Sequence, residues 1–527
     1  RDTDRSRGLG DVYKRQMKQI FLYFAMLGTL AGLSSCLDEV PYGTYSNQTF
    51  YNTEADAESA LMYAYVPLNY IDYCGRFLFY LGDVPTNQYK SYGKADESPL
   101  FQWDITPTSD EAIYFFKSAY VSLARTNSVL DNVARMSDIS AAARNKILGE
   151  AHFLRAFNHF MLVINYGSVP IRSKTVSSTS DSYKDFSPIS DVYAFIIGEL
   201  EDAIGLLPVN KVQGRADKVA AQALLARVYL YLASAKASGA PGYDWVSDAD
   251  EMYSLAARYA GDVLNNQTVY RLDPDLGNVY DVEHQADGVE HIFMTSMNRE
   301  ASGMEGTYSQ LPQMFSIQTG SIVYISSSLG KNSREVMKFL DYESGYQVMR
   351  VDNDFRNTYD DDDLRKQLMV TTIYNEDGSV LATYDPSNLT SSDNIRNKFF
   401  YPFCRKYTDP KSKANRTSAN LYLIRFAEVA LTYAEAVGPT DEGYKWVNEV
   451  RKRAGLEALP EGLPIEDFRE AVIEERTKEL AFEGHGIYDL RRLNRVDEQH
   501  ITNKAFKPTY AYFYPAPQRE LDLNPQK

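Results

Sequence analysis

The sequence predicts a mainly α protein in which paired helices form a scaffold and a large irregular segment is inserted between them. Three observations lead to this prediction. Long blocks repeat apolar residues at intervals of three and four, the period of an amphipathic helix. Gly or Pro follows where these helices should end. Between about residues 268 and 418 the chain is instead rich in Tyr, Gly, Asn, Asp and Ser, with only short apolar runs.

The start of the chain predicts an export signal. Residues 1–16 carry charges of both signs, and we interpret them as an upstream translation artefact. Residues 17–35 have the pattern of a signal peptide, because a lysine precedes an apolar stretch that is too short to cross a bilayer. The stretch ends in Leu-Ser-Ser followed by Cys36, which resembles a lipobox and implies cleavage before Cys36 and its lipidation. The alternative is a plain signal peptide with a chance cysteine.

Helices are expected in two regions of the mature chain, about 40–267 and 419–495. The helical pattern covers residues 109–136, 140–167, 189–208, 217–235, 248–266, 420–438 and 464–486. Paired helices with Ala-rich faces resemble tetratricopeptide-type packing, although no strict repeat period is present. Loop-rich segments such as 268–418 often carry binding residues that a rigid scaffold holds in place.

Charge and motif content exclude some classes of function. The formal net charge is −16, which disfavours nucleic acid as a partner. No zinc-protease, dinucleotide, P-loop or serine-hydrolase motif occurs, so we expect no enzyme and no cofactor. Aromatic residues make up 13% of the chain, with 40 Tyr against 3 Trp, and tyrosines offer apolar faces with a polar tip for recognition.

Three glutamates recur every fourth residue on the predicted helix 464–486. Glu475, Glu479 and Glu483 line up with apolar residues, so they need cationic partners on a semi-buried face. Arg491, Arg492 and Arg476 are the nearby candidates. We therefore expect a structural ion-pair network here, in preference to a catalytic carboxylate site.

Other polar residues are expected to serve the fold. His152 and His159 are seven apart on one helix and are interpreted as packing or surface residues rather than metal ligands. The acidic run Asp360–Asp363 could bind calcium, but it lacks the EF-hand spacing and is interpreted as a solvated loop. Whether Cys74 and Cys404 form a disulfide stays open.

Five segments identify a resemblance to a known family. They are LGEAHFLRAFNHFMLVINYGSVPI (148–171), AAQALLARVYLYLA (220–233), LYLIRFAEVALTYAEA (421–436), ERTKELAFEGHGIYDLRRLN (475–494) and YPAPQRELDLNP (514–525). In this order, and with the lipobox, they resemble the SusD/RagB-like family of outer-membrane nutrient-binding lipoproteins, named after SusD of the starch-utilisation system. Residues 36–527 would then form one SusD-like domain.

The resemblance implies a surface-exposed lipoprotein of the outer membrane that binds an oligosaccharide and acts as the lid of a SusC-like TonB-dependent transporter. The alternatives are the same architecture capturing peptides, or a helical-repeat adaptor that binds a protein partner and no small ligand. Family sites are assembled from the early irregular segment and the central insertion. The candidate ligand-binding residues are therefore Tyr70, Tyr73, Asp83, Asn87, Tyr89, Tyr92, Tyr308 and Tyr324. For each, core packing or contact with the transporter is the alternative.

Overall fold

Helices dominate the described structure. The structure is a computed structural model. It describes residues 50–90, 100, 103–301, 308–317, 322–327, 329, 336–338, 345–346, 348–387, 398–496 and 510–523. The predicted signal peptide, Cys36 and Tyr92 lie outside these residues. Among the helices that the structure describes, none combines the length and apolarity needed to cross a membrane.

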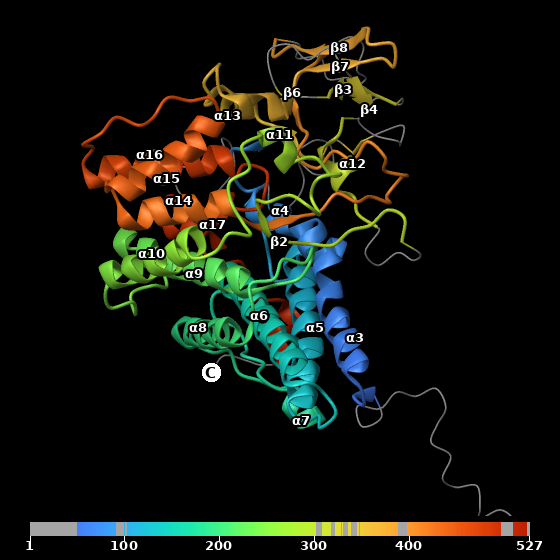
Figure 1. Cartoon of the computed structure of the whole chain (residues 1–527), viewed down its shortest axis with the longest axis vertical. Coiled ribbons are helices and arrows are strands. Elements are labelled where there is room, and N and C mark those ends of the chain that lie inside the picture. Colours follow the sequence, from blue (N-terminus) through green and yellow to red (C-terminus); the bar gives the residue numbers. More distant parts are fainter. Residues whose placement is uncertain are drawn as a thin grey trace, which may run out of the picture. The chain divides into compact units, whose positions relative to one another are not determined.

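Long helices pack in succession to form the scaffold. They are α3 (Glu54–Tyr65), α5 (Asp110–Val133), α6 (Ala141–Tyr166), α8 (Ile189–Leu206), α9 (Lys218–Ser238), α10 (Ala249–Asn265), α14 (Phe426–Val437), α15 (Asp441–Arg453) and α16 (Ile465–Glu479). Helix α5 packs on α6, α6 on α8, α9 on α10, and α10 on α14 (Figure 1). This confirms the mainly α fold predicted from the sequence.

Caps and glycines set the helix boundaries. Ser140 begins α6 by accepting a hydrogen bond from the Ala143 N–H at 3.2 Å, and Gly167 ends the helix at a φ of 71°. A side chain at Ncap satisfies an amide that the helix leaves unpaired, and glycine adopts positive φ without steric cost. Asp217 caps α9 in the same way, through the Ala220 N–H at 3.0 Å. The predicted ends of α6 and α9 lie within a few residues of the observed ones.

Residues 420–425 differ from the prediction, since they are not helical. Tyr422–Arg425 form strand β11, which pairs antiparallel with β2 (His291–Met294), and α14 begins only at Phe426. All four residues of β11 are buried. A short apolar run that is buried on every side has no amphipathic period, so its sequence does not distinguish strand from helix.

The second difference concerns the helix predicted over 464–486. Helix α16 ends at Glu479, and the chain then turns at Phe482 (φ 67°) and Gly484 (φ 81°) before α17 (Gly486–Arg492) begins. Glu483 therefore lies in this turn and not on the helix face shared by Glu475 and Glu479.

The segment between α10 and α14 consists of short strands and single helical turns. The strands are β2, β3 (Tyr324–Ser326), β4 (Val336–Lys338), β5 (Arg350–Val351), β6 (Met369–Val370), β7 (Thr372–Tyr374), β8 (Val380–Tyr384), β9 (Lys398–Phe399) and β10 (Phe403–Cys404). The helical turns are α11 (Leu276–Val279), α12 (Leu311–Phe315), α13 (Asn353–Asn357) and η4 (Leu364–Leu368). Strands β4-β3-β7-β8-β9 form one sheet, and β5, β10 and β6 form another together with β1 (Tyr89–Lys90), in the order β1-β5-β10-β6. A small apolar core, which includes Ile325, Ile373 and Phe403, holds this region together.

The early segment, residues 50–90, consists of short helical elements and one strand. After α3 come η1 (Val66–Asn69), a π-helical turn η2 (Ile71–Gly75), α4 (Phe77–Gly82) and β1 (Tyr89–Lys90). Short helices α7 (Thr179–Ser182) and α18 (Gln518–Leu523) complete the described elements. Strand β1 pairs with β5 of the central segment. This pairing joins the two irregular regions in which the candidate binding residues lie.

Candidate ligand-binding cleft

Three of the candidate residues are interior residues, so their proposed contact with a ligand is wrong. Tyr73 is fully buried; its hydroxyl donates to Asn158 Oδ1 at 2.7 Å and its ring meets the edge of Phe115. Tyr89 is 2% exposed and packs against Phe315 and Phe482. Both rings are polar-tipped core residues, the alternative raised from the sequence.

Asp83 is the third interior residue, and it ties α4 to the turn before α17. Its carboxylate accepts hydrogen bonds from the Gly484 N–H at 2.7 Å, the Gly486 N–H at 3.0 Å and the Tyr89 hydroxyl at 3.2 Å. Burial raises the pKa of the Asp83 carboxyl to about 7, although these donors pull the pKa back down. The Asp83 side chain therefore connects α4 to this turn inside the protein and serves the fold.

Two further candidates lie at the surface in different places. Tyr324 lies on β3 and pairs with Tyr374 and Lys338 across the five-stranded sheet. Asn87 is exposed and lines a cleft of about 470 Å³ beside α16 and α17. That cleft contains no tyrosine among its described lining residues. Neither residue lies with the remaining candidates.

Tyr70 and Tyr308 come together in one cleft, although 238 positions separate them. The cleft has a volume of about 400 Å³, which falls in the range typical of small-ligand sites. Tyr70 lies between η1 and η2 in an extended conformation, and Tyr308 forms a backbone bridge with Arg416. The α5 face supplies a third ring, Tyr114, which is 39% exposed.

Polar side chains line the same cleft as the three rings. Asn69 and Asp72 come from the η1–η2 segment, while Lys117 and Ser118 come from α5. Asp72 is paired with Arg76 at 3.1 Å. A cleft that offers both aromatic rings and hydrogen-bonding groups suits the two surfaces of a sugar ring, its C–H face and its hydroxyl edge. Tyr114 and Lys117 escaped the sequence interpretation because they fit the pattern of an ordinary helix surface.

The three glutamates lie in a buried ion-pair network, but with other cations than predicted. Glu475 pairs with Arg365 at 2.5 Å, Glu479 with Arg453 at 2.6 Å, and Glu483 with Lys406 at 2.6 Å and Arg425 at 2.8 Å. Burial would raise the pKa of Glu479, but the guanidinium groups of Arg453, Arg425 and Arg365 outweigh it and hold the pKa well below its usual range.

The arginines expected as partners make different contacts. Arg491 donates to the Ala511 carbonyl at 2.9 Å and the Ile164 carbonyl at 3.1 Å. Arg492 pairs with Glu435 and Asp489, and Arg476 with Asp489 and Glu428. The cations that Glu475, Glu479 and Glu483 use come from distant segments, so nearness in sequence gave the wrong partners.

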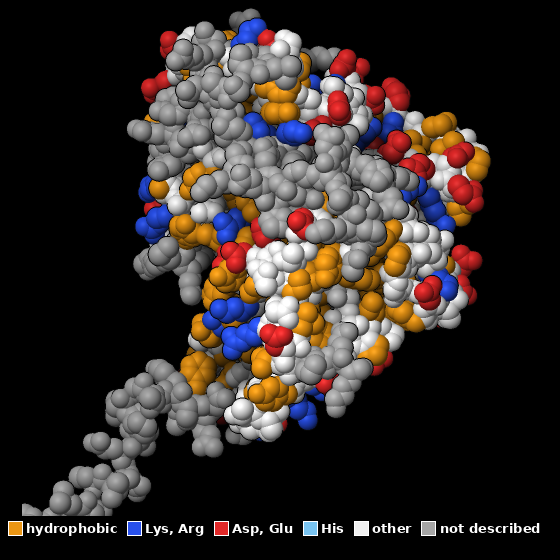
Figure 2. All heavy atoms as spheres, turned by 180° about the vertical axis from the view of Figure 1, so that it is seen from behind, with side chains coloured by type: hydrophobic (Ala, Val, Ile, Leu, Met, Phe, Trp, Pro, Cys, Tyr) orange, Lys and Arg blue, Asp and Glu red, His pale blue; other side chains and the backbone are white. Residues whose placement is uncertain are grey.

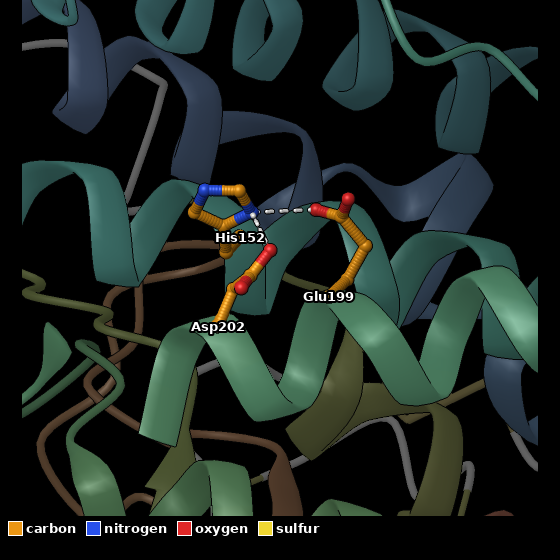
Figure 3. Close-up of side chains that lie close together, drawn as sticks. All are labelled: His152, Glu199 and Asp202. Atoms are coloured by element: carbon orange, nitrogen blue, oxygen red, sulfur yellow. Dashed lines mark hydrogen bonds and ion pairs between the residues drawn. The ribbon is translucent and has the colours of Figure 1, made fainter. Parts of the chain in front are cut away.

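His152, Glu199 and Asp202 lie close enough together to hold a metal ion (Figure 3). His152 Nδ1 is 2.8 Å from Glu199 Oε2 and 3.9 Å from Asp202 Oδ2. However, Arg155 donates to both oxygens of Glu199, each at 2.7 Å. Because this guanidinium already compensates the carboxylate, we interpret the group as an ion-pair cluster.

The other titratable residues also serve the fold. His159 is fully buried, and burial lowers its pKa to about 4. Asp363 and Asp361 of the acidic run pair with Arg365 and Lys366, respectively. Cys74 and Cys404 are both buried and free, so they do not form a disulfide with each other. On the face shown in Figure 2, acidic, basic and hydrophobic side chains of the described residues are interspersed.

Two family models match the chain. One, described as the SusD family, matches residues 290–526; the other, described as "Starch-binding associating with outer membrane", matches residues 37–230. The SusD-like protein P2 of Formosa agariphila is 26% identical over 529 residues, covering 95% of this chain and 97% of that protein.

Solved structures share the fold. A SusD homologue from Bacteroides thetaiotaomicron has a TM-score of 0.71 at 22% identity, covering 91% of this chain and 97% of the other. Surface glycan-binding protein A from the same organism, in complex with laminarihexaose, has a TM-score of 0.68 at 21% identity, covering 89% and 98%. The motifs, the fold and both family models agree that this chain belongs to the SusD/RagB-like family.

Proposed function

We propose that this protein is a cell-surface lipoprotein that captures an oligosaccharide in the cleft of Tyr70, Tyr114 and Tyr308. The observation that carries the proposal is that three partly exposed tyrosines and several polar residues line one cleft of about 400 Å³. Stacking on the rings would bind the apolar sugar faces, while Asn69 and Ser118 would bond the hydroxyls. The glycan-binding relative of the same fold adds support.

The oligosaccharide would bind non-covalently. The protein would then deliver it to a transporter, as the architecture of the family implies. A lipid on Cys36 would tether the protein to the outer membrane, and the domain would act as the lid of a SusC-like TonB-dependent transporter. The family model whose description mentions association with the outer membrane supports this location. Replacing Cys36 with serine should release the protein from the membrane fraction; retention there would contradict lipid anchoring.

The binding experiment uses the soluble domain from residue 37 onward. The wild type, the cleft variant Tyr114→Ala and the control Tyr183→Ala are screened on a glycan array and on a peptide library. Tyr183 is 53% exposed and lies outside the cleft, so its removal matches the loss of one surface ring.

We expect glycan binding by the wild type and by Tyr183→Ala, and binding weakened about tenfold by Tyr114→Ala. Peptide binding without glycan binding would favour the peptide-capturing alternative. Binding of neither class would contradict nutrient capture and leave the protein-adaptor alternative.

A further inference from the structure

Two positive charges on α5 flank the aromatic cleft. Lys117 lines the cleft between Tyr114 and Val121, and Arg125 lies about one turn beyond Val121 on the same face, because positions 114, 117, 121 and 125 recur every three or four residues. At a rise of about 1.5 Å per residue, Lys117 and Arg125 stand about 12 Å apart along the helix.

Arg125 is held in place beside the cleft by neutral groups. Its guanidinium lies 3.5 Å from the centroid of the Tyr63 ring. It donates to the Tyr63 carbonyl and to the Tyr70 hydroxyl, both at 3.0 Å. A guanidinium has five N–H donors, so about three remain for a ligand. Because the Arg125 guanidinium stacks on the Tyr63 ring by its face, its N–H groups at the edge stay available to a ligand and keep a fixed orientation.

Neither cation has a carboxylate partner within the described residues. Some cations of the scaffold are neutralised by carboxylates, such as Arg155 by Glu199 and Arg215 by Glu150, but the ion pairs of the described residues include neither Lys117 nor Arg125. The acid of the cleft, Asp72, is already paired with Arg76 at 3.1 Å. Lys117 in the cleft and Arg125 beside it therefore carry uncompensated positive charge in a chain whose formal net charge is −16.

We propose that the ligand is an acidic oligosaccharide whose carboxylate or sulfate groups bind Lys117 and Arg125 while its rings stack on the tyrosines. A planar guanidinium matches the oxygens of either anion, and charge-assisted bonds are roughly twice as strong as neutral ones. Because the two Cα positions stand about 12 Å apart along the helix, we expect the two anions to lie on different sugar units. This inference rests on the proposed glycan capture at the same cleft.

The test compares matched ligands and matched variants. The ligands are uronate-containing oligosaccharides and their carboxyl-reduced forms, and sulfated oligosaccharides and their desulfated forms. The proteins are the wild type, Lys117→Gln, Arg125→Gln and the control Arg135→Gln. Arg135 is exposed just beyond the C-terminal end of α5. The control therefore removes one positive charge near the same helix without touching the cleft.

We expect binding of the charged members, roughly tenfold weaker binding by each cleft variant, and no change in Arg135→Gln. Binding should also weaken as salt rises, as screened charges require. The two ligand pairs separate carboxylate from sulfate as the anion. Binding of the neutral forms with equal affinity, unaltered in both cleft variants, overturns this inference and leaves glycan capture standing. Binding of no glycan overturns both.

Discussion

The Arg425 guanidinium donates two parallel hydrogen bonds to the Glu483 carboxylate, from Nε to Oε2 at 2.8 Å and from Nη2 to Oε1 at 2.9 Å. Arg425 belongs to β11 and Glu483 to the turn between α16 and α17, and both side chains are buried. Burial opposes both charges, so each depends on the other and on the surrounding ions. The pair therefore fixes the strand against the C-terminal helices.

Removing this guanidinium should destabilise the fold strongly. Arg425→Met leaves Glu483 and Glu479 with fewer cations in the interior, so we expect the free energy of unfolding to fall by about 3–5 kcal/mol in urea titrations. The control is Lys445→Met, which breaks the half-exposed pair with Glu442 and should cost less than about 1 kcal/mol. Equal losses in both variants would contradict a special role for the buried network.

A methyl group at Gly82 should not fit. A Cβ there would stand 2.4 Å from the Gly484 carbonyl oxygen, which is backbone that cannot rotate away. We expect Gly82→Ala to lower the free energy of unfolding by about 1–3 kcal/mol, as measured by thermal unfolding. Gly198→Ala is the matched control, because Gly198 lies in α8 with open space around it and alanine should stabilise the helix by about 0.5–1 kcal/mol. Stabilisation in both variants would show that α4 and the turn are not in close contact.

Mild acid should destabilise the protein through His159. The folded pKa of about 4 lies below the unfolded value of about 6.5, so the folded state binds fewer protons between these pH values. The contribution of neutral His159 to the free energy of unfolding is therefore complete above pH about 6.5 and is lost as the pH falls towards 4. Between pH 7 and 5, the wild type should lose about 2 kcal/mol more than His159→Gln. Parallel pH profiles of unfolding free energy would contradict this.

Exposed and buried tyrosines should separate binding from stability. Tyr308→Ala removes a cleft ring, and we expect glycan affinity to fall about tenfold with little change in unfolding. Tyr73→Phe removes only the hydroxyl that bonds Asn158, so we expect unchanged affinity and a loss of about 1–2 kcal/mol in unfolding free energy. Isothermal titration and urea unfolding measure the two effects. Reduced affinity in Tyr73→Phe would return Tyr73 to the list of ligand contacts.

The helical scaffold could be predicted because its signals are local. Helices α5 and α6 show apolar periodicity, and α6 and α9 have N-cap side chains that accept amide hydrogen bonds and glycines at their C-caps. Strand β11 could not be predicted, since its pairing with β2 depends on residues that lie about 130 positions away. The need of Glu475, Glu479 and Glu483 for cations also followed from sequence, but the identity of those cations did not.

Helix periods, family motifs and the kinds of residue that could build a cleft can all be read from the order of amino acids. That Tyr70 and Tyr308 share a cleft while Tyr73 and Asp83 lie in the core is known only from the folded arrangement. Exposure and contact depend on what the rest of the chain places around a side chain. A tyrosine has the same chemistry in both settings, and its neighbours in space determine whether it packs or binds.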